Sequence, residues 1–238
     1  MIRMEFSFTK TTDKATLYRL VDYARQVHYK TTYRTGIYLP DFWRSRDVIV
    51  EEKPFKTHGL RGMAVPADLY STQRDIIILN SNRSTKEKNF DCAHESIHIT
   101  FHWKIHRQPF SCYDRIVANQ DSYLEWQANE GAAEYLVPYK IFIPLTVDKW
   151  DMLTELYPMD MENEFLKPMS DLFNVPISVI RIRLISLRSE IEQYINGVPL
   201  ENLRFYSNND LNRLNKKVYS IFDIQEINYL HYLTRISV

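Results

Sequence analysis

Residues 93–102 read AHESIHITFH, and this stretch determines how the rest of the chain is interpreted. On an α-helix, His94 and His98 lie one turn apart on one face, where two imidazoles can share a single cation. Glu95 lies about 100° around the helix from His94, near enough to hold a water molecule rather than bind the metal. Zinc peptidases use this HExxH arrangement, because zinc lowers the pKa of bound water towards about 7 and the glutamate acts as a general base. The pattern predicts a metal site with Glu95 as its catalytic residue.

The five-residue pattern has three fixed positions, and by itself it also fits a helix with two histidines beside a solvated glutamate. Two further features separate these interpretations: a strand before the helix and a third metal ligand. Residues 75–80, DIIILN, form the clearest strand in the sequence and precede the helix. The sequence therefore meets the first condition.

Two more histidines, His102 and His106, continue the stripe of His94 and His98 along the helix. At a rise of about 1.5 Å per residue, His102 lies roughly 12 Å along the axis from His94, too far to bind the same ion. We expect His102 beside the ligands, where it packs or faces substrate. We expect His106 at the helix C-terminus, where the helix dipole favours it.

An acidic ligand can come from the next helix, which the sequence predicts over residues 122–136, before Pro138. Glu125 and Asn129 lie one turn apart, as suits a carboxylate ligand and a carbonyl that accepts from a ligand imidazole. Glu130 and Glu134 have the same spacing, and the residues alone favour Glu125 only slightly. Three alanines on this helix are small enough to let it approach the first helix closely: Ala128, Ala132 and Ala133.

The remaining patterns predict an α+β fold, with a few strands followed mostly by helices. A first helix is expected over residues 12–29 with Thr12 or Asp13 as its N-cap. Strands are expected at 47–52, 60–65 and 75–80, a polar turn over 81–88, a helix over 89–103, and then a loop containing Pro109. Helical segments are expected at 147–157, 165–175 and 177–195; the tail from Pro199 has no clear periodicity. We expect a domain over residues 1–195 and a C-terminal extension of unknown role over 196–238.

Composition narrows the class of protein. Lys and Arg together number 30, as do Asp and Glu, which argues against a nonspecific nucleic-acid binder. The sequence shows neither a signal peptide nor an apolar run of the roughly 18 residues that a membrane helix needs. Two cysteines do not form a disulfide scaffold, so a cytoplasmic setting is the expectation. Cys92 is interpreted as a small buried hydrophobic residue, and Cys112 as an accessible loop residue.

The sequence resembles the ImmA/IrrE-like metallopeptidases. Their hallmark is AHE-x-x-H-x-x-x-H, followed a few dozen residues later by E-x-x-AN-x-x-AA-x-x-L-x-P. The matching positions are Ala93, His94, Glu95, His98, His102, Glu125, Ala128, Asn129, Ala132, Ala133, Leu136 and Pro138. The resemblance covers about residues 12–190. It implies a zincin-like domain in which a small β-sheet packs on a helical core that carries the HExxH helix.

Carried over by position, the resemblance implies His94, His98 and Glu125 as ligands of Zn²⁺, or of Mn²⁺, with Glu95 as the catalytic residue. It thereby favours Glu125 over Glu130. The chain has Ser96 and Ile97 where the family usually has Leu-Gly, so the wall behind the metal is expected to differ.

Three further residues are candidates for positions beside the ligands or facing substrate: Asn129, His102 and Tyr113. No residue matches a known oxyanion donor. Tyr113, in the expected loop 107–121, is the nearest candidate for that role.

Proteins of this kind are typically encoded with a helix-turn-helix repressor, which they cleave to relieve repression in mobile elements or stress responses. The resemblance therefore implies a cytoplasmic metal-dependent endopeptidase that cleaves such a repressor at a specific site, with no direct contact to nucleic acid or membrane. Two alternatives remain: a noncatalytic zincin-like module that sequesters a partner or senses metal, and a broader cytoplasmic endopeptidase.

Overall fold

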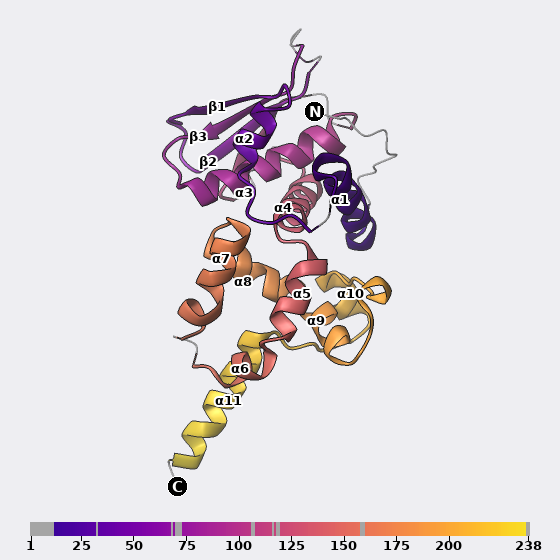
Figure 1. Cartoon of the computed structure of the whole chain (residues 1–238), viewed down its shortest axis with the longest axis vertical. Coiled ribbons are helices and arrows are strands. Elements are labelled where there is room, and N and C mark those ends of the chain that lie inside the picture. The colour runs from indigo at the N-terminus through magenta and orange to yellow at the C-terminus, as the bar shows by residue number, and fades with distance from the viewer. Residues whose placement is uncertain are drawn as a thin grey trace. The chain divides into compact units, whose positions relative to one another are not determined.

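The computed structural model describes residues 12–31, 33–67, 69, 73–105, 108–115, 117, 120–157 and 160–236. His106, expected at a helix C-terminus, lies outside these residues. The chain forms two compact units, which can be followed by residue colour in Figure 1. The first runs to Leu136 and includes Asn174–Pro176; the second comprises Val137–Phe173 and the chain from Ile177. The expected boundary near residue 195 lies within the second unit, and the division between a family domain and an extension stays a prediction.

The first unit contains a four-stranded sheet, as far as the described residues show, with the order β1-β3-β2-β4. Its strands are β1 (Ile49–Lys53), β2 (Leu60–Val65), β3 (Ile76–Asn80) and β4 (Phe110–Tyr113). β1 pairs with β3 in parallel, whereas β2 pairs antiparallel with both β3 and β4. The three expected strands are confirmed. The expectation of a loop at residues 110–113 was wrong, because FSCY pairs with β2 and its alternation buries Phe110 and Cys112.

Helix α3 (Thr85–Ile97) packs on β2 and β3 and continues as a π-helix, η1 (His98–His102). It begins four residues before the expected start at Asn89, because a capping box satisfies its first backbone groups. The Ser84 hydroxyl faces the Glu87 N–H, and the Glu87 carboxylate accepts from the Ser84 N–H at 2.9 Å. Of the expected polar turn over residues 81–88, the second half, residues 85–88, therefore belongs to α3.

The other helices of this unit are α1 (Lys14–Tyr29), α2 (Leu39–Arg44) and α4 (Ser122–Leu136). Asp13 caps α1 as expected, and α4 has the bounds that the sequence predicted. The short helix α2 was not expected. α1 packs on α4, while α2 packs on α3 and β1 (Figure 1).

A buried ion-pair cluster fixes α3 against the sheet. Asp91, whose side chain is fully buried, accepts from Arg61 of β2 at 2.8 Å and from Arg83 at 2.6 Å. Arg61 falls where the pairing of β2 with β4 shifts register, between Leu60 and Gly62. Removing one partner of a buried pair typically costs about 3–5 kcal/mol, so this cluster holds α3 at one position along β2.

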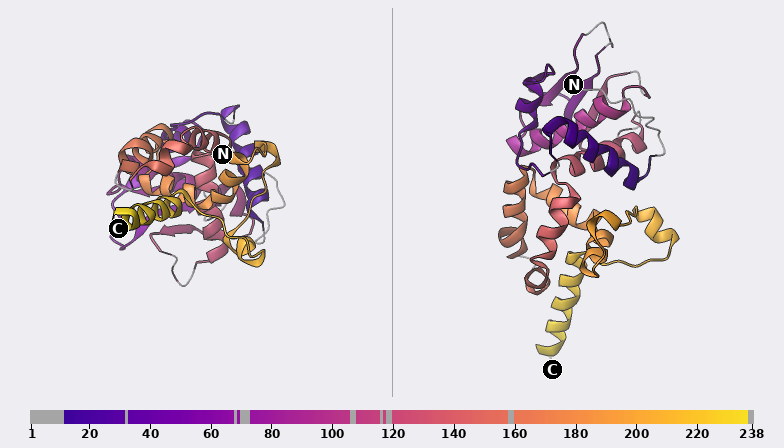
Figure 2. Two further views of the ribbon diagram at one scale, coloured as in Figure 1. Left: turned by 90° about the horizontal axis from the view of Figure 1, so that it is seen from below. Right: turned by 45° about the vertical axis from the view of Figure 1, so that its right-hand side comes forward.

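The second unit is helical within its described residues. Its elements are α5 (Tyr139–Val147), α6 (Trp150–Glu155), η2 (Glu162–Leu166), α7 (Lys167–Phe173), α8 (Ile177–Ser186), α9 (Arg188–Ile195), η3 (Leu200–Asn202), α10 (Asn208–Arg213) and α11 (Ile221–Ile236). The three expected helical segments are confirmed, and α5, α10 and α11 are additions. Phe142 contacts the rings of Phe165 and Phe173 in the core. α11, which Figure 2 shows from two further sides, packs against α6.

None of the helices in the described part of the chain combines the length and apolar character needed to cross a membrane.

His28 on α1 lies buried among aromatic side chains. Its Nδ1 is 2.9 Å from the Tyr135 hydroxyl, and its ring packs edge-on against Trp43. Burial, and to a smaller extent the charge of Arg46, lowers the pKa of His28 from 6.5 to about 4. His28 is therefore a neutral imidazole at pH 7.

We expect the free energy of unfolding to fall as the pH drops from 6.5 to 4, because over this range the unfolded chain protonates His28 and the folded chain does not. Replacing His28 by Phe should remove up to about 3 kcal/mol of this dependence. Urea unfolding at a series of pH values, followed by tryptophan fluorescence, measures it. Parallel curves for the two proteins across this range would contradict the prediction.

Candidate metal centre

The last turn of α3 and the start of η1 bring His94 and His98 together. Their Nε2 atoms lie 3.1 Å apart. Glu125, in the first turn of α4, completes the group: its Oε2 is 3.2 Å from His94 Nε2 and its Oε1 is 3.5 Å from His98 Nε2. All three side chains are buried, so three ligand atoms from two helices converge at one protected point.

The spacing of these atoms fits a divalent metal ion. Ligand atoms at 2.0–2.1 Å from a tetrahedral zinc ion lie about 3.3 Å from one another. The three measured separations, 3.1, 3.2 and 3.5 Å, lie around this value. Two histidines and one carboxylate are also a donor set of catalytic zinc sites. The residues present could therefore hold a metal ion.

The second nitrogen of each histidine is engaged by a neighbouring side chain. His94 Nδ1 lies 3.1 Å from Asn129 Oδ1, and His98 Nδ1 lies 2.9 Å from His102 Nδ1. Because the Asn129 oxygen can only accept, His94 carries its proton on Nδ1 and presents a lone pair at Nε2. Such outer contacts orient metal-binding imidazoles. Asn129 and His102 thus lie beside the two histidines, where the sequence placed them.

The walls of the site come from β4 and α4. Phe110 of β4 stacks on His98, with ring centroids 4.3 Å apart and an angle of 17° between the rings. Ile97 packs against Gly131 of α4, where an added Cβ would lie 3.2 Å from the Ile97 Cδ1. Gly131 therefore makes room for the branched side chain that stands where the family usually has a glycine.

The structure also shows where the competing acid lies. Glu130 accepts a hydrogen bond from the Tyr18 hydroxyl of α1. Among the described residues, Glu125 is the carboxylate within reach of both His94 and His98. The choice between Glu125 and Glu130, which the residues alone left open, depends on this difference in orientation.

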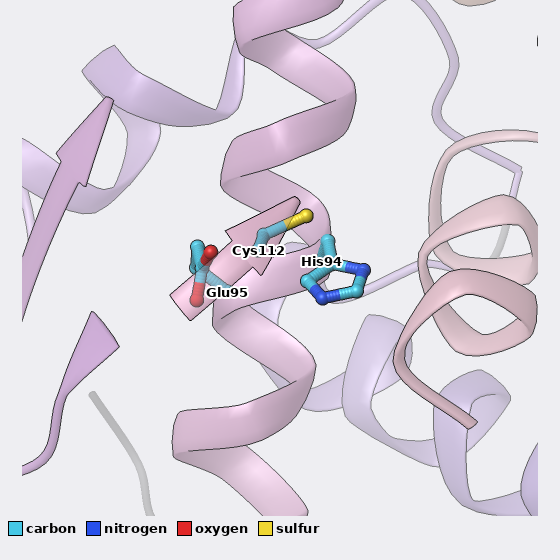
Figure 3. Close-up of side chains that lie close together, drawn as sticks. All are labelled: His94, Glu95 and Cys112. Atoms are coloured by element: carbon cyan, nitrogen blue, oxygen red, sulfur yellow. The ribbon is translucent and has the colours of Figure 1, made fainter. Parts of the chain in front are cut away.

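Glu95 is fully buried beside the three converging residues, and Figure 3 shows it next to His94 and Cys112. Neither of its carboxylate oxygens has a hydrogen-bond partner of ordinary geometry in the described part of the chain. Burial raises the pKa of Glu95 well above its usual range, and the charges of Glu125 and Asp91 raise it further. Arg61 and the backbone N–H of Cys112 oppose this rise. A neighbouring cation would stabilise the charged form of this buried carboxylate.

Gly62 of β2 fixes the other side of Glu95. A Cβ added at Gly62 would lie 2.9 Å from the Glu95 Oε1, closer than real contacts allow. The strand therefore approaches the carboxylate so closely that only glycine fits without a shift of Glu95. Sequence reasoning missed Gly62, since nothing local distinguishes it from any other glycine in a strand.

Cys112 was expected in an accessible loop, and this was wrong. It lies in β4 with 1% of its surface exposed, close to Glu95 and His94, and burial raises the pKa of its thiol. Cys92 is buried, as expected. The alternation of FSCY was the available signal for Cys112, but a strand of four residues is weak evidence without its partner.

Tyr113 follows Cys112 at the end of β4 rather than in a loop. It lines a cavity of about 110 Å³ beside the candidate metal centre. The other lining residues are Gln108, Pro109, Phe110, Ser111, Gln120, Asp121, Leu124 and Glu125. Tyr113 and Glu125 thus border the same cavity, and a role for Tyr113 as oxyanion donor stays a prediction.

A mixed sheet that carries an HExxH helix, with a carboxylate supplied by the next long helix, defines a domain of the metallopeptidase type. The family model for the IrrE N-terminal-like domain (Peptidase_M78) matches residues 45–184, more than half of the chain, and the chain belongs to this family. The match confirms the resemblance drawn from the two sequence motifs, and with it the α+β fold class. No curated protein shows significant similarity to the chain.

Replacing Glu125 by Ala should weaken metal binding by more than the roughly 10- to 100-fold that loss of an outer contact costs, because one ligand atom is removed. Glu130→Ala is the matched control on the same helix and should retain wild-type affinity, because Glu130 bonds to Tyr18. Competition with a zinc-binding dye measures both affinities. Equal affinities for the two variants would contradict the assignment.

Proposed function

We propose that this chain is a zinc-dependent endopeptidase in which His94, His98 and Glu125 hold the ion and Glu95 is the general base. The proposal rests on one observation: two imidazole Nε2 atoms and a carboxylate converge beside a second, buried carboxylate. The mixed nitrogen and oxygen donor set favours Zn²⁺, with Mn²⁺ as the second candidate.

When bound, the metal supplies Lewis acidity that polarises a carbonyl and lowers the pKa of water towards about 7. Glu95 accepts the proton of the attacking water on a carboxylate oxygen and later donates it to the leaving amine nitrogen. Asn129 and His102 hold the rings of His94 and His98 in place throughout.

The proposed substrate is a helix-turn-helix repressor, cleaved at a specific site in the cytoplasm. The family resemblance supports this, since such peptidases typically relieve repression in mobile elements or stress responses. The equal numbers of basic and acidic residues fit a protein substrate, and the proposal includes no direct contact with nucleic acid or membrane. Transcription regulation would then follow from loss of the repressor.

Glu95→Gln should lower the cleavage rate by about 10²- to 10⁴-fold, because an amide cannot take the proton from water. Zinc affinity should stay close to that of the wild type, since Glu95 is not a ligand. The assay incubates each protein with zinc and the repressor encoded beside its gene, and follows fragments by mass spectrometry. An unrelated unfolded protein such as casein is the second substrate.

Each outcome of this assay separates the proposal from its alternatives. Cleavage of the repressor at one bond, lost in Glu95→Gln, supports the proposal. Cleavage of casein at a similar rate favours a broader endopeptidase. Equal relief of repression by both proteins, without fragments, favours a noncatalytic module that sequesters its partner.

Gly62→Ala tests the fit of Glu95 against β2. The added methyl group meets the Glu95 Oε1 and must displace it, and a displacement near 1 Å can lower a catalytic rate by about 100-fold. We expect a lower kcat with unchanged zinc affinity, because the atoms nearest to the added methyl group belong to Glu95, which is not a proposed ligand. Unchanged kcat would show that Glu95 acts from another position.

A further inference from the structure

A second group of donors lies on the sheet side of the candidate metal centre. One ligand atom from each of His94, Glu95 and Cys112 lies within 4.8 Å of the other two, and all three residues are buried (Figure 3). Cys112 comes from β4 and the other two from α3, so the group exists only in the folded chain. The proposed function uses two of these residues and leaves Cys112 without a role.

The chemistry of this group differs from that of His94, His98 and Glu125. A thiolate sulfur is a soft ligand that selects zinc, cadmium and similar ions over magnesium, calcium or manganese. The second indication of a ligand is Glu95: neither of its two fully buried oxygens has a hydrogen-bond partner of ordinary geometry among the described residues. Glu95 therefore directs an unsatisfied carboxylate into the same space as the Cys112 sulfur.

The surrounding charges favour a cation here. Asp91 is already paired with Arg61 and Arg83, whereas Glu95 and Glu125 have no guanidinium partner of their own in the described structure. The cavity lined by Ser111, Tyr113 and Glu125 lies beside β4.

We infer that His94, Glu95 and Cys112 form an inhibitory site for a soft divalent cation, of which Cd²⁺ is the best probe. Binding replaces the thiol proton of Cys112, which passes to solvent, with a sulfur–metal bond, and no oxidation is involved. Because His94 Nδ1 is engaged by Asn129, the shared ligand atom is Nε2. The site of His94, His98 and Glu125 and the site of His94, Glu95 and Cys112 therefore compete for one ion. An ion at the latter site binds Glu95 and prevents it from acting as the general base.

The test is a titration of the metal-free full chain with Cd²⁺, followed by the ultraviolet charge-transfer absorption of a cadmium–thiolate bond. We expect this absorption in the wild type and its loss in Cys112→Ser, with affinity for Cd²⁺ at least about tenfold weaker. Cys92→Ser is the matched control, since Cys92 is also buried but faces away from His94, and it should keep the absorption. His98→Ala should also keep the absorption, because His98 is not among the three proposed cadmium ligands.

A measurement on the wild type alone covers the case in which Cys112→Ser fails to fold. The ¹¹³Cd NMR shift distinguishes a sulfur ligand from a site of nitrogen and oxygen alone, and we expect the sulfur signature. A wild-type shift of the nitrogen–oxygen type, or charge-transfer absorption that persists in folded Cys112→Ser, would overturn the inference. These readouts need no peptidase activity, so a chain that binds cadmium through Cys112 without cleaving protein would refute only the proposed function.

Discussion

The site depends on how closely α3 and α4 approach each other. Glu125 can lie 3.2 Å from the His94 Nε2 only because small residues line the contact between the two helices. Gly131 receives the side chain of Ile97, and Ala128 and Ala132 are fully buried in the same region. A larger side chain at Gly131 would push the helices apart and separate the carboxylate from the histidines. The convergence of these three candidate ligands is therefore a consequence of backbone packing, not of the histidine pair alone.

Helix α3 carries two buried carboxylates in very different states. Asp91 is bonded to Arg61 and Arg83, so its charge is compensated and it anchors the helix to the sheet. Glu95, one turn later, is equally buried but has no such partner among the described residues. Natural proteins rarely keep a buried charge uncompensated, because the loss of solvation is costly. The same helix thus carries one carboxylate, Asp91, that anchors it to the sheet and another, Glu95, that is available for proton transfer.

Local signals in the sequence were sufficient for much of this fold. The run DIIILN identified β3, and the HExxH spacing identified the face of α3 that carries the histidines. The capping pair Ser84 and Glu87 is also a local signal, and it explains why α3 starts before the expected Asn89. Long-range features could not be read in this way. β4 became a strand through pairing with β2, and the orientation of Glu130 depends on Tyr18, more than a hundred residues away in sequence.

The most direct test is a crystal structure of the zinc-bound chain with anomalous diffraction collected at the zinc edge. The account predicts one anomalous peak about 2.0–2.2 Å from the Nε2 atoms of His94 and His98 and from a carboxylate oxygen of Glu125. Glu95 should lie beside the peak without binding it. A peak elsewhere, or a Glu125 side chain directed away from both imidazoles, would contradict the account.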